Sequence, residues 1–402
     1  MRMDRTVRNA LAASAVVITA LSLAAVPALA GTHGAKASHD PYLAADTHLN
    51  TPATIGGAGS TFAAPLQNAA QVIYAARSND ATIDGYQPVG SGTGESDILK
   101  KLVDWGGSDV PMSQSDIWQK EPSGYDYRLG GLLQVPIALG GVAISYNLPG
   151  LKAHTTLTLT AAVLAKIYEG AVTNWNSAAI QALNPKVKLP HTKIVVVARA
   201  DSSGTTYIFT NFLRSAAPKI WSTQPSKTPL TLPTGGIAGS GNAGVAADIV
   251  NTPNAVGYVE YSYVLLNPSL LKGVAAIVNR AGKAVTPSLA GIAAAAAAKP
   301  GITATNFAIV WQPGKTSYPI AGYTWAIIWK VNRTGDAEGT LLVKYLDWLS
   351  HSGAAIGTTA GQDVAALQGY VPLPANIQAL ARRTLLKVTG SHGQVLLTTK
   401  GN

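Results

Sequence analysis

The chain has 402 residues, of which 47% are apolar and 12% are charged, and it contains no cysteine. This composition predicts a globular protein with one large or two medium-sized cores, and it excludes disulfides, thiolate metal sites, a cysteine nucleophile and a lipid-modified cysteine. The net charge of +10 suggests an anionic partner. We do not expect that partner to be nucleic acid, because the basic residues are scattered and do not interleave with aromatic residues.

The first thirty residues have the features of a secretory signal peptide. Three arginines in the first eight residues precede an apolar run, and the small residues ALA stand at positions 28–30. The alternative is a membrane-spanning helix, since the run approaches the ~18 residues that cross a bilayer. The small residues favour cleavage, so we expect a periplasmic or secreted protein without a lipid anchor.

From residue 53 onward, short apolar segments, glycine-rich turns and amphipathic segments follow one another. The segment 56–77 predicts a turn and a helix, and 81–103 predicts a strand, a second glycine turn and another helix. The segment 103–113 predicts short strands. The apolar segment 132–150 predicts a buried pair of strands with a crossover near Pro136.

The second half of the chain continues this alternation. Residues 160–170 predict a helix, 194–213 a buried strand that runs into a helix, and 254–264 a further strand. The alanine-rich segment 288–301 predicts a helix, with a low-complexity linker as the alternative, and 340–353 predicts a helix that Gly353 ends. Such alternation is typical of an α/β fold with mainly parallel sheets, and we expect two lobes of similar size.

Three joins between a strand and a helix contain glycine and hydroxyl residues. They are GSTF at 59–62, GSGTG at 90–94 and DSSGT at 201–205. The first N–H groups of a helix have no partner within it, and the helix dipole is positive there, so such a join suits an anion. A single join can be ordinary N-capping, but three in one chain favour an anion site.

Two charged residues accompany the third join. Arg199 follows the apolar core of the predicted strand, and its guanidinium can form paired hydrogen bonds with a tetrahedral oxyanion. Asp201 can hold that guanidinium in place. The alternative is an exposed ion pair of little energetic value, although ligands of open α/β sheets normally bind at strand ends.

Asp109 is unusual near an anion site, because a carboxylate repels an anion unless the anion carries a proton. A protonated phosphate has a P–OH group that can donate to Asp109, whereas sulfate near neutral pH has none. An unpaired buried carboxylate facing sulfate would cost several kcal/mol, enough for strong discrimination. The alternative is an ordinary turn or helix-capping residue.

Other chemical motifs are weaker. The segment 106–110 lacks the last glycine of a G-x-S-x-G elbow, and Ile309 replaces the first glycine of a P-loop. Residues 239–244 match G-x-G-x-x-G, with Glu260 about 20 residues later, but the preceding TPLTLPTGG makes a poor parallel strand. The histidines are dispersed, so we expect no metal and no other cofactor.

Eight blocks along the chain resemble, in the same order, the periplasmic phosphate-binding proteins that serve ABC-type phosphate uptake transporters, the PstS-like family. The similarity runs from about residue 56 to residue 380. The blocks are GAGSTFAAPL, GSGTGES, GGSDVPMS, VPIALGGVAISYNLPG, IYEGAVTNWN, ARADSSGTTYIFTNFL, GSGNAG and VGYVEYSYV.

The resemblance implies a type II periplasmic-binding-protein fold. In this α/β fold, each of two lobes is a mainly parallel sheet flanked by helices, and crossover strands form the hinge between them. The implied divisions are a signal peptide at 1–30, a flexible lead at 31–52, lobe I at 53–138 plus 318–385, lobe II at 139–317 and a C-terminal tail at 386–402.

The resemblance also implies the binding residues. Phosphate is expected to be bound by Thr61, Phe62, Ser91, Asp109, Arg199, Ser203, Gly204 and Thr205, with Asp201 orienting Arg199. The chain departs from the family at Ser60, where alanine is common, and at Ser202, where glycine is common.

The expected function is that of a monomeric receptor without enzymatic activity, which captures inorganic phosphate and delivers it to the membrane subunits of an ABC-type permease. Three alternatives stay open. The protein could bind another oxyanion such as arsenate or sulfate, or act as a secreted scavenger or adhesion protein on the same scaffold. It could also be a secreted phosphatase, which would need a nucleophile or a metal.

Overall fold

The fold is that of a computed structural model, which describes residues 53–77, 81–112, 130–152, 154–332, 335–352 and 360–397. The described residues all belong to one compact unit. The expected signal peptide, the flexible lead and Gly353 lie outside the described residues. Within the described part, no helix has both the length and the apolar character that crossing a bilayer requires.

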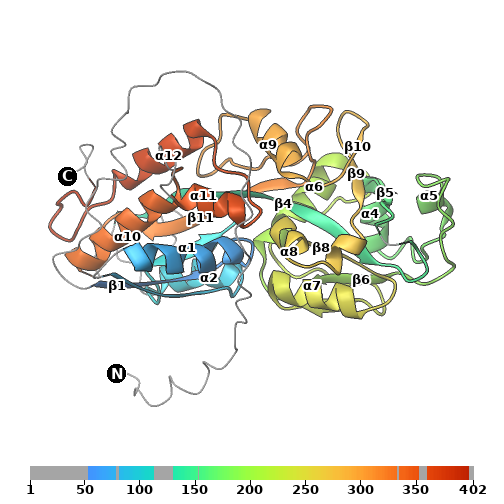
Figure 1. The fold of residues 1–402 in the computed structure, drawn as a ribbon, viewed down its shortest axis with the longest axis horizontal. Coiled ribbons are helices and arrows are strands. Elements are labelled where there is room, and N and C mark those ends of the chain that lie inside the picture. Colours follow the sequence, from blue (N-terminus) through green and yellow to red (C-terminus); the bar gives the residue numbers. More distant parts are fainter. Residues whose placement is uncertain are drawn as a thin grey trace, which may run out of the picture. The chain divides into compact units, whose positions relative to one another are not determined.

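Strands and helices alternate along the chain (Figure 1). The strands are β1 (Ala53–Gly59), β2 (Ala81–Gln87), β3 (Trp105–Ser108), β4 (Leu132–Asn147), β5 (Thr158–Leu159), β6 (Val195–Arg199), β7 (Ile237–Gly239), β8 (Ala255–Glu260), β9 (Ala276–Val278), β10 (Ala284–Val285) and β11 (Ala321–Trp329). The helices are α1 (Ala64–Arg77), α2 (Ser91–Leu99), α4 (Ala161–Tyr168), α5 (Ala178–Gln181), α6 (Gly204–Ala216), α7 (Gly241–Asn251), α8 (Tyr261–Leu265), α9 (Leu289–Ala297), α10 (Asp336–Leu349), α11 (Gly361–Leu367) and α12 (Ala375–Leu385), with a 3-10 turn η3 (Leu270–Lys272).

Eight strands form one sheet in the order β2-β1-β3-β11-β4-β8-β6-β7. Strand β1 runs parallel to β2 and β3, and β6 runs parallel to β7 and β8. Strands β11 and β4 lie between these parallel groups and pair with antiparallel neighbours. The prediction of an α/β fold is confirmed, and the sheet is mixed because of its two central strands.

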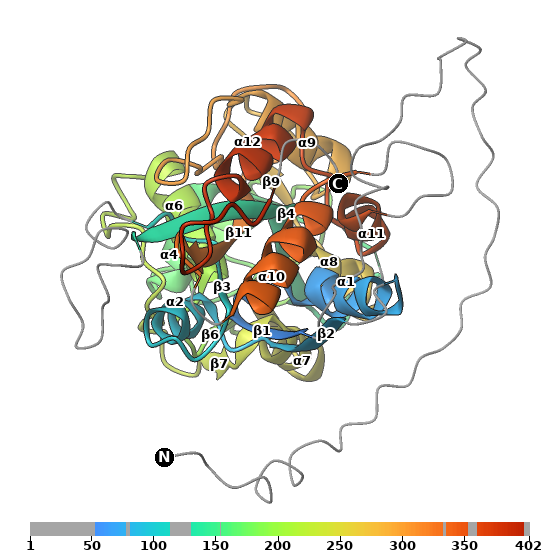
Figure 2. The ribbon, with the colours of Figure 1, turned by 90° about the vertical axis from the view of Figure 1, so that its left-hand side faces the viewer.

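Strand β4 is continuous through both parallel groups. Its residues 132–141 pair with β11, and its residues 142–147 pair with β8. We call β1, β2, β3, β11 and residues 132–141 the first strand group, and residues 142–147, β6, β7 and β8 the second strand group. In Figure 1, α1, α2 and α10 lie beside the first group, and α6, α7 and α8 beside the second. Figure 2 shows α1, α2 and α10 gathered around β1 and β3.

The predicted pair of strands at 132–150 is wrong, since these residues form the single strand β4. Pro136 does not mark the change of partner, which occurs between Gly141 and Val142. Proline has no N–H to donate to a ladder. The register with β11 shifts beside Pro136 instead, because Trp325 pairs with Pro136 and Thr324 pairs with Ala138.

The helices predicted at 160–170, 288–301 and 340–353 are confirmed as α4, α9 and α10. Helix α10 ends at Leu349, four residues before Gly353. The strand predicted at 254–264 ends at Glu260 and continues as the short helix α8. Glu260 itself begins that helix, because its carboxylate accepts a hydrogen bond from the Ser262 N–H at 2.8 Å.

Candidate functional site

The three polar joins identified in the sequence stand at the starts of α1, α2 and α6. The second and third joins come from different strand groups, yet they are in direct contact. The Gly204 N–H donates to Ser91 Oγ at 3.1 Å, and the Gly92 N–H donates to the Ser202 carbonyl at 3.1 Å. The two groups run in opposite directions and are offset along β4, so the carboxyl ends of β3 and β8 face each other near the partner change of β4, and the joins meet there.

Asp109 follows β3 and points into this region. Its side chain is 1% exposed, and its Oδ1 accepts a hydrogen bond from Ser60 Oγ at 2.6 Å. Ser60 Oγ in turn accepts from the Phe62 N–H at 3.0 Å, so Ser60 is held as a donor to the carboxylate. The other oxygen, Oδ2, faces Gly204 and lies 3.5 Å from Ser91 Oγ.

The environment of Asp109 changes its acidity. Burial raises the pKa of Asp109 to about 6. Hydrogen bonds from Ser60, Thr324 and Ser91 and the charge of Arg199 act in the opposite direction and limit this rise. The side chain is therefore a carboxylate at neutral pH and takes up a proton in mildly acidic solution. An exposed turn residue would not show such a shift.

Arg199 lies at the end of β6 and is 1% exposed, so the alternative of a solvent-exposed ion pair is wrong. Its Nε donates to Asp201 Oδ1 at 2.8 Å and its Nη2 donates to Asp201 Oδ2. Its Nη1 donates to Thr205 Oγ1 at 3.2 Å. Asp201 thus holds one side of the guanidinium, and Nη1 faces the start of α6.

Asp201 remains ionised beside this guanidinium. Burial acts to raise the pKa of Asp201, but the hydrogen bonds and charge of Arg199 and the N–H of Gly241 outweigh it and lower the pKa. The Gly241 N–H donates to Asp201 Oδ1 at 3.0 Å. The pair therefore remains charged, and its two charges offset each other.

Ser203 has the capping role that the sequence left open. Its Oγ accepts from the Thr206 N–H at 3.1 Å and so caps α6, while its own N–H donates to the Lys227 carbonyl at 2.7 Å. Its hydroxyl hydrogen stays available for a further acceptor. The predicted residues Thr61, Phe62, Ser91 and Thr205 are all buried near these groups.

Sequence reasoning missed Asn242. This residue lies in the first turn of α7, is fully buried, and bonds Thr61 from the first strand group and Thr205 from the second. It belongs to the G-x-G-x-x-G segment 239–244. The segment TPLTLPTGG does not form a strand, which agrees with the prediction. The three-residue strand β7 follows this segment, runs parallel to β6 and leads directly into the motif.

A second missed contact joins α2 to the loop that contains Lys227. Lys227 forms an ion pair with Glu95 of α2, and Glu95 also accepts a hydrogen bond from Ser108 Oγ at 2.6 Å. Ser108 precedes Asp109, and the Lys227 carbonyl holds Ser203. The pair therefore connects residues next to predicted ligands on both sides.

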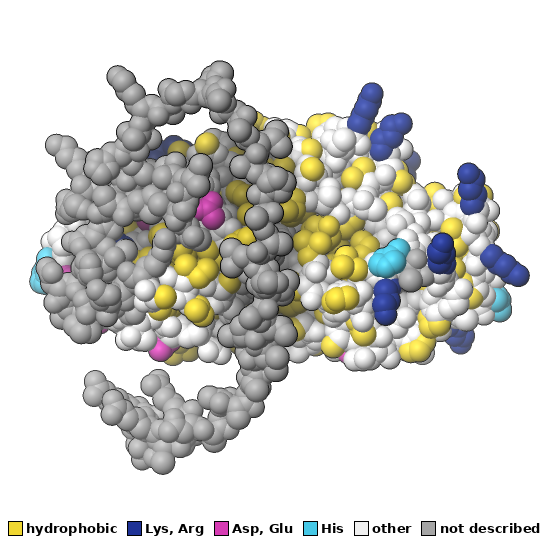
Figure 3. Space-filling model, in the orientation of Figure 1, with side chains coloured by type: hydrophobic (Ala, Val, Ile, Leu, Met, Phe, Trp, Pro, Cys, Tyr) yellow, Lys and Arg dark blue, Asp and Glu magenta, His cyan; other side chains and the backbone are white. Residues whose placement is uncertain are grey.

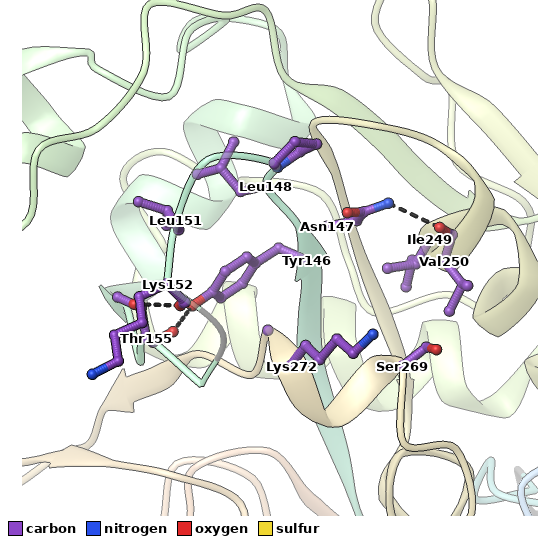
Figure 4. Close-up of a pocket in the computed structure, with 12 residues that line it drawn as sticks. Tyr146, Asn147, Leu148, Leu151, Lys152, Thr155, Ile249, Val250, Ser269 and Lys272 are labelled. Atoms are coloured by element: carbon purple, nitrogen blue, oxygen red, sulfur yellow. Dashed lines mark hydrogen bonds between the residues drawn. The ribbon is translucent and has the colours of Figure 1, made fainter.

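A separate cavity of about 260 Å³ lies between residues 146–155 and residues 249–273 (Figure 4). Tyr146, Lys152 and Lys272 are among its lining residues, and none of the predicted site residues lines it. The Tyr146 hydroxyl is bonded to the Leu157 N–H at 3.2 Å, and the Asn147 amide to the Val250 carbonyl at 2.9 Å. These polar groups are therefore engaged in hydrogen bonds within the protein. The predicted phosphate site does not include them.

Known proteins resemble this chain over most of its length. The PBP superfamily domain matches residues 44–351. The phosphate-binding protein PstS of Xylella fastidiosa is 33% identical over 325 residues, which cover 80% of this chain and 82% of that protein. The PstS protein of Haemophilus influenzae is 32% identical over 331 residues, covering 81% of this chain and 90% of that protein.

Solved structures share the fold. A high-affinity periplasmic phosphate-binding protein, PfluDING, solved with bound phosphate, superposes with a TM-score of 0.66 at 24% identity and covers 82% of this chain and 93% of its own. A phosphate-binding protein from Stenotrophomonas maltophilia has a TM-score of 0.60 at 23% identity, with the same coverage. At this level of identity the likeness supports the fold.

Proposed function

We infer that this chain, which belongs to the PstS family of phosphate-binding proteins within the PBP superfamily, binds inorganic phosphate at the site formed by Asp109, Arg199 and the start of α6. It is a binding protein of an ABC-type phosphate uptake system and not an enzyme. The buried carboxylate of Asp109, placed opposite a helix N-terminus and a guanidinium, is the observation that carries this proposal.

This combination of groups suits a protonated oxyanion. The N-terminus of α6 and the guanidinium of Arg199 attract negative charge, whereas Asp109 repels it. Only an anion that carries a hydrogen can satisfy all three, because its hydroxyl can donate to Asp109 Oδ2 while its other oxygens accept. Phosphate carries such a hydrogen near neutral pH and sulfate does not, so we expect strong preference for phosphate.

Neutral groups supply much of the binding. Since Asp201 offsets the charge of Arg199, the anion is held by directed hydrogen bonds as much as by net charge. The hydroxyls of Thr61, Ser91, Ser203 and Thr205 and the backbone N–H groups of Phe62 and Gly204 are the proposed donors. In a buried site such bonds are stronger than in water.

We propose that binding couples to the approach of two lobes, residues 53–138 with 318–385 and residues 139–317. The partner change of β4 between Gly141 and Val142, and the hydrogen bond from the Val142 N–H to the Ile320 carbonyl at 2.8 Å, support a hinge at these boundaries. Contacts such as Gly204 to Ser91 then exchange for contacts with phosphate oxygens.

The surface charge fits an anion carrier. Residues 139–317 contain fourteen Lys and Arg but only four Asp and Glu, so most of the net positive charge lies in this part. Figure 3 shows Lys and Arg side chains projecting over the region of β10, α4 and α5. We propose a monomeric protein outside the cytoplasm that collects phosphate and passes it to the membrane subunits of the permease.

Calorimetric titration of the purified, phosphate-stripped protein tests the proposal. We expect saturable binding of one phosphate per chain at neutral pH and sulfate binding at least about a hundredfold weaker, because an unpaired buried carboxylate costs several kcal/mol. Equal affinity for both anions, or no binding of phosphate, would contradict the proposed function.

Replacing Gly204 by alanine is expected to weaken phosphate binding by about a hundredfold or more. A Cβ at this position would collide with the carboxylate of Asp109 and would lie 2.6 Å from Ser91 Oγ, so the two sides of the site could not approach. Gly301→Ala is the matched control, because nothing lies within 4 Å of a Cβ added there. Calorimetry and thermal unfolding of both variants check this, and unchanged affinity in Gly204→Ala would refute the close approach.

A further inference from the structure

Asn242 makes four hydrogen bonds, and the two with Thr61 link the side of the second strand group to the loop that follows β1. Its backbone N–H donates to Thr61 Oγ1 at 3.1 Å, and its side-chain Nδ2 donates to Thr61 Oγ1 at 2.9 Å and to Thr205 Oγ1 at 3.1 Å. Its Oδ1 accepts from the Glu260 N–H at 3.0 Å. Every donor and acceptor of this amide is therefore engaged, apart from one lone pair.

The orientation of the amide is fixed by Glu260. A backbone N–H can only donate, so the atom of Asn242 that faces it must be the carbonyl oxygen. The NH₂ group must then face the two threonines. The reversed orientation of the amide is excluded, because it would place the NH₂ group of Asn242 against the Glu260 N–H, and both groups are donors.

The amide in turn fixes the two threonine hydroxyls. Thr61 Oγ1 accepts two hydrogen bonds from Asn242, and Thr205 Oγ1 accepts one from Asn242 and one from Arg199 Nη1. A hydroxyl oxygen has two lone pairs, and in both residues these are occupied. Each hydroxyl can therefore only donate to a further partner.

We propose that Asn242 is a positioning residue that holds the hydroxyls of Thr61 and Thr205 as hydrogen-bond donors for the oxygens of bound phosphate. A hydroxyl that rotates freely also presents its lone pairs, which repel an oxyanion, and fixing it beforehand lowers the cost of binding. The proposal rests on the proposed function, and it assigns to Asn242 no direct contact with the anion.

The role differs from that of Asp109 in its effect on selectivity. The fixed hydroxyls donate to unprotonated oxygens, which phosphate and sulfate both have. Loss of Asn242 should therefore lower the affinity for phosphate and the affinity for sulfate by the same factor, and the ratio of the two affinities should not change. Loss of Asp109 should change the ratio.

The test measures phosphate and sulfate affinity by calorimetry in Asn242→Ala, with Asn184→Ala as the matched control. Asn184 is also buried, and its amide bonds Thr158 and Ile180, away from the predicted ligands. We expect both variants to unfold at lower temperature. Only Asn242→Ala should lose affinity, by about tenfold for each anion.

A double-mutant cycle with Thr205→Val decides between positioning and general structural support. If Asn242 acts through the threonine hydroxyl, Asn242→Ala should cost less affinity in the Thr205→Val background than in the wild type, by about threefold or more. Additive losses, or wild-type affinity in Asn242→Ala, would overturn the proposal.

A further variant covers the case in which Asn242→Ala does not fold. Asn242→Asp keeps an oxygen for the Glu260 N–H but replaces the NH₂ donor by an acceptor, so the threonine hydroxyls would turn toward the new carboxylate. We expect a loss larger than about tenfold, and wild-type affinity would again overturn the proposal. If the wild-type protein binds phosphate and these variants are unaffected, only this inference fails, whereas a wild-type protein that binds no phosphate refutes the proposed function as well.

Discussion

Phosphate binding should fall by about a thousandfold or more when Arg199 is replaced by alanine. The change removes the only guanidinium that bonds Thr205 among the described residues, and it leaves the partly exposed carboxylate of Asp201 without its cation. The anion would lose the charge-assisted hydrogen bonds of the guanidinium, and the unpaired carboxylate of Asp201 would stand near the anion and repel it. Calorimetry with phosphate measures the loss.

Two further variants separate the hydrogen bonds of the guanidinium from the effect of positive charge alone. Arg199→Lys keeps the positive charge but cannot make the paired bonds to Asp201, so we expect an intermediate loss and a folded protein. Lys219→Ala removes an exposed positive charge from the same part of the chain and should leave the affinity within about twofold. Phosphate affinity near the wild-type value in Arg199→Ala would show that the guanidinium is not a ligand.

Replacing Asp109 by asparagine should remove most of the discrimination against sulfate. The amide can donate to an unprotonated oxygen where the carboxylate could only accept, so sulfate should gain and phosphate should lose affinity. We expect the affinity ratio to fall by about a hundredfold. Asp84→Asn, an exposed position on β2, is the control, and an unchanged ratio in Asp109→Asn would refute the role of the carboxylate.

The pH dependence of sulfate binding gives an independent view of the same group. The folded-state pKa of Asp109 is raised to about 6, mainly by burial, so the side chain is protonated below that pH and can then donate. Sulfate affinity should therefore rise as the pH falls from about 7.5 to about 5. In Asp109→Asn the affinity should not change over this range, and a flat wild-type profile would contradict the assignment.

The site could be predicted from the sequence to the extent that its chemistry is local. Glycine and hydroxyl residues between a strand and a helix favour a helix N-terminus that an anion can approach, and this pattern marked the loops of Thr61, Ser91 and Ser203. Arg199 and Asp201 are two residues apart, so their pairing could also be inferred. The structure brings all three joins together and buries their predicted ligands.

Contacts between distant segments could not be inferred in the same way. Asn242 and Thr61 are separated by 181 positions, and the G-x-G-x-x-G pattern around Asn242 suggested only a nucleotide site or a plain loop. Ser60, noted in the sequence as a departure from the family, proves to hold Asp109. Which partner such a side chain finds depends on the packing of both strand groups.

The continuity of β4 was missed for a packing reason. The sequence placed a crossover near Pro136, whereas β4 changes partner after Gly140 and Gly141 without a break. A Cβ at Gly140 would lie 2.9 Å from Glu260 and Phe62, and one at Gly141 would lie 2.8 Å from Ile292. These glycines therefore allow side chains of other elements to pack against the strand and do not interrupt it.

A crystal structure of the protein with bound phosphate tests the central claim most directly. We expect phosphate between the two strand groups, with one oxygen within hydrogen-bond distance of Asp109 Oδ2 and others contacting the Arg199 guanidinium and the Gly204 N–H. Phosphate bound elsewhere, or a carboxylate of Asp109 turned away from it, would contradict the account.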